Sequence, residues 1–206
     1  MLLSTKAPRL TLGHGLREHQ RLLSAFASSP GDTGAVAPSS RRLAELLTAD
    51  VGLDVARTIV ELGAGTGVVT REIQARAGQD STVLVLELNP YLARPLAASF
   101  PKLQVVNDCA ESLPALLRAR GLPKAETIVS ALPWASFAPD RQERLLDAVE
   151  ESLSAGGQFC SVAYLHASGL PGGRRFHREL KRRFASVEAT RVVWRNLPPA
   201  FVYRCR

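Results

Sequence analysis

The stretch Val60-Glu61-Leu62-Gly63-Ala64-Gly65-Thr66-Gly67 decides the fold of this 206-residue chain. The apolar run at 58–62 predicts a buried strand, and the glycines after it predict a sharp turn that opens a helix. Glycine is needed in such a turn because the backbone must bend tightly and let a ligand approach without a Cβ in the way. Strand, glycine turn and helix in this order are typical of nucleotide-binding sheets.

Short apolar runs alternate with helical patterns through most of the chain beyond this turn. Alternation of this kind predicts an α/β fold with a doubly wound, mostly parallel sheet. Two β-rich runs near the end, separated by a proline-rich turn, predict an antiparallel hairpin that closes the sheet. The expected strands are 58–62, 82–87, 103–107, 127–130, 158–164, 186–194 and 201–205, and the expected helices are 14–28, 39–49, 68–77, 89–100 and 140–154.

Two details of the glycine turn favour S-adenosylmethionine over a dinucleotide. The spacing is GxGxG, one residue tighter than the pyrophosphate-binding GxGxxG. Glu61 also stands two residues before the first glycine, where an acidic group would repel a pyrophosphate but suits the α-ammonium of a bound amino acid. We therefore expect S-adenosylmethionine as cofactor. The turn residues expected to bind it are Glu61, Gly63, Gly65, Thr66 and Gly67.

Further cofactor-binding positions are expected after the other strands. Glu87 ends the second strand, about 20 residues beyond the turn, where a carboxylate accepts hydrogen bonds from ribose hydroxyls. Asp108 follows the third strand and is expected to accept from the adenine amino group, with the Cys109 amide against the ring. Leu88 and Ser130, at the ends of the second and fourth strands, complete the predicted cofactor site.

The fourth strand runs into Ser130-Ala131-Leu132-Pro133-Trp134, which is similar to the Asn-Leu-Pro-Tyr turn of N-methyltransferases. An aromatic ring facing an amine that gains a methyl group stabilises the developing cation by roughly 0.5–2 kcal/mol. Trp134 is predicted to have this role, and the alternative is a core residue. Ala131 replaces the asparagine that would hold the amino group of adenine, which favours an aliphatic amine as acceptor over a nucleic-acid base.

Taken together, these motifs resemble those of the bacterial phospholipid N-methyltransferases, and the resemblance covers nearly the whole chain. It implies a class I Rossmann-like fold and methylation of phosphatidylethanolamine towards phosphatidylcholine. RNA adenine N6-dimethylation is the alternative, because such enzymes share the glycine turn, a basic surplus and a Leu-Pro-aromatic turn. The segments that carry the resemblance are 33–40 (TGAVAPSS), 61–70 (ELGAGTGVVT), 87–90 (ELNP), Leu132-Pro133, Tyr164 and 196–200 (NLPPA).

The acceptor amine must be neutral to attack, and a free primary amine is mostly protonated at neutral pH. Tyr164 and His166 are the candidate proton acceptors, since both follow the fifth strand at the edge where ligands bind. For the lipid phosphate we expect Ser39, Ser40 and Arg41 at a helix N-terminus, together with Arg195. The remaining predicted substrate-binding residues are Leu132, Pro133 and Asn196.

The net charge of +7 is unevenly distributed, because residues 156–206 carry ten basic and two acidic side chains. A basic surplus indicates a polyanionic partner, either an anionic membrane surface or nucleic acid, unless it is only a solvated face. The apolar stripe of 14–28 predicts an interfacial helix or one packed on the protein's own core. A second basic stretch at 174–183 could add to membrane attraction.

These features predict a domain organisation and a location in the cell. Residues 1–50 are expected to form a helical extension for membrane association and substrate closure, and 51–206 the methyltransferase domain. We expect no signal peptide, membrane-spanning helix, disulfide framework or metal site. The expected location is the cytoplasm, with peripheral association to the inner face of the membrane.

Overall fold

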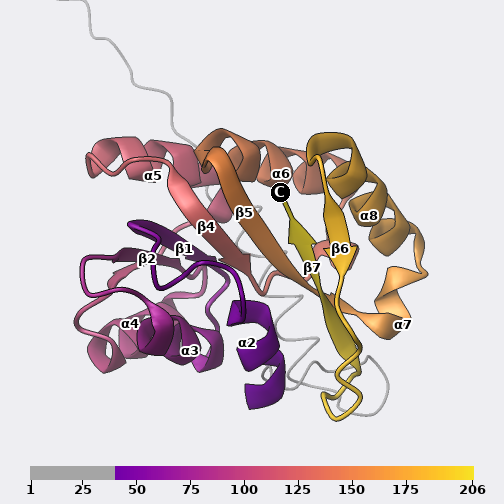
Figure 1. Cartoon of the computed structure of the whole chain (residues 1–206), viewed down its shortest axis with the longest axis horizontal. Helices are drawn as coiled ribbons and strands as arrows, with labels where there is room; N and C mark the ends of the chain where they lie inside the picture. The colour runs from indigo at the N-terminus through magenta and orange to yellow at the C-terminus, as the bar shows by residue number, and fades with distance from the viewer. Residues whose placement is uncertain (1–39) are drawn as a thin grey trace, which may run out of the picture. The chain divides into compact units, whose positions relative to one another are not determined.

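The computed structural model of the protein describes residues 40–206, which contain a seven-stranded sheet of order β3-β2-β1-β4-β5-β7-β6 (Figure 1). The strands β1 to β5 are parallel, whereas β7 is antiparallel to both β5 and β6. The predicted parallel sheet with a C-terminal antiparallel hairpin is therefore confirmed. The strands are β1 Thr58–Leu62, β2 Thr82–Leu86, β3 Gln104–Val106, β4 Ala125–Ser130, β5 Leu153–Tyr164, β6 Val187–Ala189 and β7 Ala200–Cys205.

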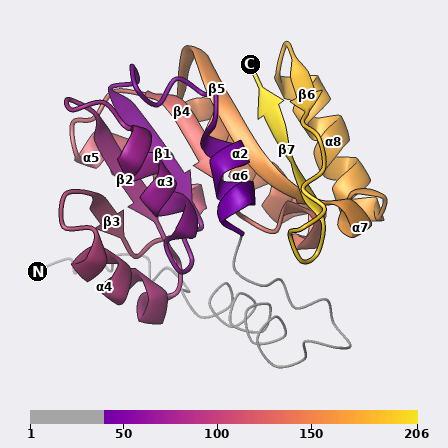
Figure 2. The same cartoon turned by 60° about the horizontal axis from the view of Figure 1, so that its bottom comes forward.

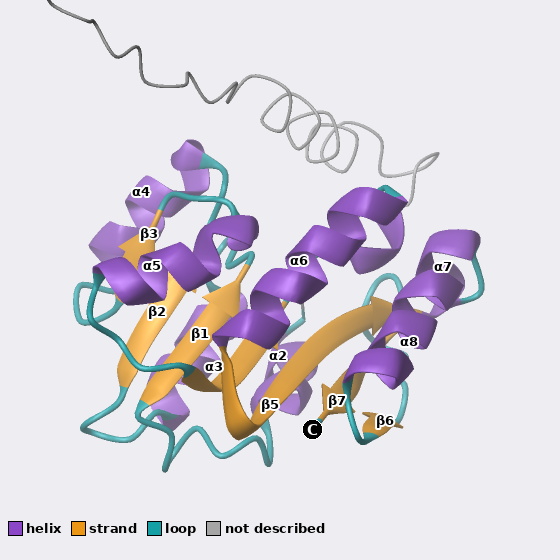
Figure 3. Ribbon diagram, turned by 90° about the horizontal axis from the view of Figure 1, so that it is seen from above, coloured by secondary structure: helices purple, strands orange, loops and turns teal. Residues whose placement is uncertain are grey.

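Helices cover both faces of the sheet (Figures 1 and 3). One face carries α2 (Arg41–Thr48), α3 (Val68–Arg76) and α4 (Pro90–Ser99). The other carries α5 (Leu113–Ala119), α6 (Pro139–Ser152) and α8 (Pro171–Arg183). Because side chains alternate along each strand, the sheet divides the buried apolar residues into two clusters, one beneath each helical layer. Shorter turns are α7 (Leu165–Ser168), η1 (Ala110–Ser112) and η2 (Trp134–Ser136).

Helix α2 was predicted as part of an N-terminal extension, but it belongs to the sheet domain. Ser40 caps it by accepting a hydrogen bond from the Leu43 N–H at 3.3 Å. Leu43 and Leu47, one turn apart, are fully buried in the same cluster as β1 and α3. The predicted helix 14–28 lies outside the described residues. Among the helices that are described, none is long and apolar enough to cross a bilayer.

Helices α5 and α8 are absent from the sequence-based expectation. The α8 segment is strongly basic, so its composition does not reveal the apolar stripe formed by Phe176 and Leu180. These residues are four positions apart, and both are buried. Gly172 lets the first turn of α8 lie directly against η2, since a Cβ at this position would collide with the Ala135 carbonyl oxygen. The basic stretch 174–183 is therefore first of all a core-covering helix.

Candidate functional site

The glycine turn lies at the carboxyl edge of the sheet, between β1 and α3. Gly63 and Gly65 have φ values of 76° and 56°, in the left-handed region that other residues rarely adopt. A Cβ on Gly63 would lie 2.7 Å from Leu132 Cδ2, so the turn after β4 packs directly on this glycine. Around Gly65 no atom would lie within 4 Å of a Cβ, which leaves open space beside the backbone. Gly67 is the N-cap residue of α3, and Thr66 is exposed.

Glu61 is fully buried, yet neither of its carboxylate oxygens has a hydrogen-bond partner within residues 40–206. Burial raises its pKa to about 8; the Thr70 hydroxyl acts against this rise, and the Glu87 carboxylate adds to it. An unpaired buried carboxylate is costly, and a cation bound beside it would remove most of that cost. Glu61 therefore fits the predicted contact with an ammonium group. Thr70, on the first turns of α3, is part of this environment and was not predicted.

Glu87 is hydrogen-bonded to the backbone of the glycine turn. Its two carboxylate oxygens accept hydrogen bonds from the Gly65 and Asn89 N–H groups, each at 2.8 Å. The Asn107 amide donates to the carbonyl oxygens of Glu87 and Leu88, both at 2.8 Å, and so fixes the turn after β2. Each carboxylate oxygen keeps a second lone pair that a ligand hydroxyl can use. Asn107 is a positioning residue that the sequence analysis did not identify.

Asp108 turns the chain from β3 into η1. Its Oδ1 atom accepts from the Cys109 N–H at 2.7 Å and from the Ser112 hydroxyl at 3.1 Å. Its Oδ2 atom has no partner within residues 40–206, so it can accept from a ligand amino group. Contact between the Cys109 amide and the adenine ring stays a prediction, and its N–H donates to Asp108 in this structure. Leu88 is half-buried at the neighbouring strand end.

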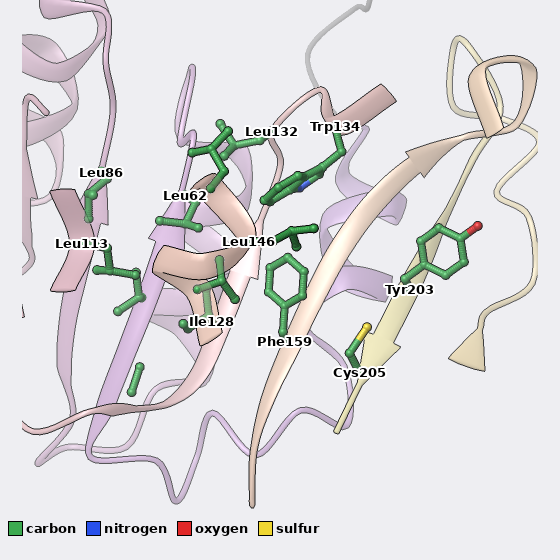
Figure 4. Close-up of a cluster of buried hydrophobic side chains, with 14 of the residues drawn as sticks. Leu62, Leu86, Leu113, Ile128, Leu132, Trp134, Leu146, Phe159, Tyr203 and Cys205 are labelled. Carbon is green, nitrogen blue, oxygen red and sulfur yellow. The ribbon is translucent and has the colours of Figure 1, made fainter. Parts of the chain in front are cut away.

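Trp134 does not face an acceptor amine, which corrects its predicted role. The indole is 2% exposed and stacks on Phe176, with ring centroids 4.7 Å apart. Figure 4 shows it above Phe159 within the buried cluster. Phe137 and Phe159 contact it edge-on, so both the face and the edges of the ring are occupied. The fully buried Ser130 hydroxyl accepts from the indole N–H at 3.0 Å and so supports the core. Leu132 is likewise a member of this buried cluster, while Pro133 is half-buried.

The remaining candidate residues gather at the carboxyl edge near β5 and β7. Tyr164 ends β5 and is half-buried, and its ring centroid lies 6.1 Å from that of the exposed His166. Arg41 is exposed and forms an ion pair with Glu45 at 3.0 Å. Asn196 is buried and accepts a hydrogen bond from the Ser40 N–H at 2.9 Å, so its amide is structural. Arg195, next in the chain, is exposed, and Ser39 lies outside the described residues.

Several basic side chains of α8 are engaged within the fold, so the stretch is less available for binding than its composition predicts. Arg183 is paired with Asp147 and Glu150 of α6, at 2.6 and 2.7 Å. Arg182 is paired with Glu179 on its own helix at 2.7 Å. The Arg175 guanidinium donates to Gln142 and to the Phe137 carbonyl oxygen.

The strand order, the glycine turn and the acidic residues at its strand ends define a class I S-adenosylmethionine-dependent methyltransferase. Solved structures share this fold: the O-methyltransferase of Bacillus cereus in complex with SAH has a TM-score of 0.62 and 17% identity, covering 96% of this chain and 91% of that one. The O-methyltransferase TomG of Streptomyces achromogenes in complex with SAM has a TM-score of 0.62 and 19% identity, covering 93% and 89%.

A relative found by sequence narrows the family further than the shared fold does. The ornithine lipid N-methyltransferase of Singulisphaera acidiphila is 35% identical over 175 residues, which are 84% of this chain and 87% of the relative. The chain belongs to the family of that enzyme. No family model matches the chain.

Proposed function

We propose that the protein transfers methyl groups from S-adenosylmethionine to the amine of a lipid headgroup. The observation that carries the proposal is the 35% identity to a lipid N-methyltransferase over most of both chains. The acidic residues at the ends of β1, β2 and β3 support it as candidate donor-site residues. The family also gives no support to the RNA alternative, and Ala131 has no side-chain amide with which to hold an adenine amino group.

The donor site rests on three carboxylates. Glu61, buried and unpaired, would bind the α-ammonium of the cofactor. Glu87 would accept from the ribose hydroxyls, and Asp108 Oδ2 from the adenine amino group. The open space beside Gly65 allows the cofactor to lie against the backbone. Bound there, S-adenosylmethionine supplies a sulfonium-activated methyl group for direct displacement by a nucleophilic nitrogen.

On the acceptor side, the protein has to align the amine and receive its proton. Alignment of two reactants is the main contribution an enzyme makes to a transfer of this kind. Tyr164, half-buried at the end of β5, is the better placed proton acceptor, and the exposed His166 is the alternative. For the headgroup phosphate or carboxylate, Ser40, Arg41 and Arg195 remain candidates. Asn196 positions Ser40, and Leu132 supports the glycine turn from behind.

Two headgroups are specific candidates. The motif resemblance favours phosphatidylethanolamine and its methylated derivatives, towards phosphatidylcholine. The name of the Singulisphaera relative favours ornithine lipid, which also carries a primary amine. Both substrates would enter from a bilayer, which fits peripheral association with the inner membrane face and a closing function for the residues before α2.

The test is methyl transfer from radiolabelled S-adenosylmethionine to vesicles that contain either lipid, followed by thin-layer chromatography. We expect labelled lipid from the wild type and a large loss of turnover in Tyr164→Phe. Glu61→Ala should lose cofactor binding by calorimetry. Label in RNA but in neither lipid would overturn the proposal, and unchanged cofactor affinity in Glu61→Ala would remove the donor-site assignment.

A further inference from the structure

Large apolar side chains are exposed mainly at one edge of the sheet. Six are exposed within residues 40–206, and five of these stand where the parallel strands end or where β7 begins. Since Ala200 of β7 pairs with Tyr164 at the end of β5, both sets lie at the carboxyl edge. Only Val55, just before β1, is at the opposite edge. The five are Tyr91, Leu165, Leu170, Trp194 and Leu197.

The connection between β6 and β7 presents two of these side chains near the acceptor side. Trp194 is 69% exposed and Leu197 is 72% exposed. The backbone between them is fixed, because the Val193 N–H donates to the Ala200 carbonyl oxygen at 2.7 Å and the Asn196 N–H to the Val193 carbonyl oxygen at 3.1 Å. A rigid turn therefore holds an indole and a leucine out in solvent, which costs hydrophobic free energy unless another phase receives them.

A groove lined by several basic side chains lies between this connection and α2. Figure 2 shows α2 beside the segment that leads into β7. The volume of the groove is about 600 Å³, and its lining includes Arg42, Arg191 and Arg195 as well as Trp194. These three arginines have no ion-pair partner within residues 40–206. Glu45 also lines the groove, but the three arginines give it a basic balance. Arginine binds phosphate oxygens through paired N–H donors, so these guanidinium groups fit the phosphodiesters of lipid headgroups.

We propose that this face, the β6–β7 connection with the adjoining basic groove, docks on the interface of an anionic phospholipid bilayer. Trp194 and Leu197 enter the headgroup region, where an amphipathic indole is favourable. Arg42, Arg191 and Arg195 contact lipid phosphates. The inference rests on the proposed function in one respect, namely that the acceptor lipid must reach the glycine turn at this same edge.

Tryptophan fluorescence tests the docking directly, since the chain has two tryptophans and only Trp194 is exposed. Vesicles of phosphatidylcholine with phosphatidylglycerol should shift the emission to shorter wavelength, whereas pure phosphatidylcholine should shift it far less. Trp194→Phe should abolish the shift, because the buried Trp134 does not meet the lipid. An unchanged wild-type spectrum with the anionic vesicles would overturn the proposal.

Vesicle sedimentation of the full chain gives the second measurement. Trp194→Ala with Leu197→Ala should weaken binding at least tenfold, and the matched control Val55→Ala should not. Alanine at Arg42, Arg191 and Arg195 should weaken binding by roughly fivefold per residue. The charge-matched control replaces Arg57, Lys102 and Lys124, which are exposed just before β1, β3 and β4 at the opposite edge. Equal losses in test and control variants would overturn the proposal.

The outcomes separate docking from catalysis. The Trp194 and Leu197 double variant should still methylate lipid dispersed in detergent, because neither residue belongs to the donor site. If the wild type methylates no lipid but the binding losses appear as expected, the function fails and the docking face stands. If the double variant binds vesicles like the wild type while deletion of 1–39 abolishes binding, the N-terminal segment is the membrane anchor and the proposed face is wrong.

Discussion

The side-chain amide of Asn196 joins two segments that lie 156 residues apart, because its Oδ1 atom accepts the Ser40 N–H at 2.9 Å. Its amide nitrogen donates to the Pro198 carbonyl oxygen at 2.7 Å. One buried side chain thus fastens the start of α2 to the turn before β7. Ser40, the last residue of the 33–40 segment, is therefore in direct contact with the 196–200 segment.

Asn196→Ala is expected to lower the free energy of unfolding by about 1–3 kcal/mol, because it leaves a partly buried N–H and carbonyl group without these partners. Urea denaturation measures this loss, and amide exchange in the first turn of α2 should become faster. Arg195→Ala, at the neighbouring exposed position, is the control and should change stability little. Equal stabilities for the two variants would contradict a structural role for the Asn196 amide.

Gly65→Ala separates backbone strain from loss of ligand space. Gly65 and Gly121 both have positive φ, 56° and 63°, and a Cβ on either would meet nothing within 4 Å. Alanine at each position should therefore cost a similar amount of stability, about 1–2 kcal/mol. Only Gly65→Ala should weaken S-adenosylmethionine binding, by at least tenfold in calorimetry, because its methyl group enters the space beside the turn. Unchanged affinity would show that the cofactor lies elsewhere.

The raised pKa of Glu61 makes stability depend on pH. Its pKa is about 8 in the folded protein against 4.5 as the ordinary value, so the folded state keeps a proton that the unfolded state releases. Between these two values, wild-type stability should fall as pH rises, by up to about 1.4 kcal/mol per pH unit. Below about pH 4.5 Glu61 is protonated in both the folded and the unfolded state, so this group no longer makes stability depend on pH.

Glu61→Gln removes this titration, so its stability advantage over the wild type should grow between about pH 5 and about pH 8. Urea midpoints at the two ends of the range measure the difference. Glu143→Gln, on the exposed side of α6, is the control for losing one carboxylate. An advantage that stays constant with pH would contradict a buried, proton-bearing Glu61.

Much of the fold could be predicted because its signals are local. The apolar run 58–62 coincides with β1, and the expected helix 89–100 corresponds to α4, which begins at Pro90 after a capping Asn89. The carboxylates at 61, 87 and 108 could be placed because parallel strands end at one edge of a sheet. The hydrogen-bond partners of these residues could not be predicted. Asn107 contacts the Glu87 and Leu88 carbonyls only because β2 and β3 lie side by side, and this pairing is not visible in either segment alone.

Trp134 shows where local reasoning failed. The Leu-Pro-aromatic turn predicted an indole at the acceptor, but the ring's surroundings come from α8, whose basic composition concealed its buried stripe. Phe176 of that helix stacks on one face of the indole, and the ring is almost fully buried. The prediction for α2 was wrong for the same reason. Its contacts with β7 and α3 make it part of the sheet domain rather than of an extension.

Trp134→Ala should consequently lower the free energy of unfolding by about 3–5 kcal/mol, because it opens a cavity among three phenylalanines. Trp134→Phe retains most of the packing and should lose less. Thermal denaturation measures both, and turnover of Trp134→Phe on dispersed lipid should stay within a few-fold of the wild type. A turnover loss beyond tenfold with wild-type stability would restore a role for the indole at the acceptor.

Cofactor binding should release a proton from Glu61. At about pH 7 the free protein holds the proton, since the pKa is about 8, whereas an ammonium bound beside the carboxylate favours its ionised form. Calorimetric titration with S-adenosylmethionine in two buffers of different ionisation enthalpy counts the protons released, and the expected number is close to one. The number should fall above about pH 8, where Glu61 is already ionised in the free protein. Glu61→Gln, if it still binds, should release none. Equal binding enthalpies for the wild type in both buffers would mean that the ammonium does not meet Glu61.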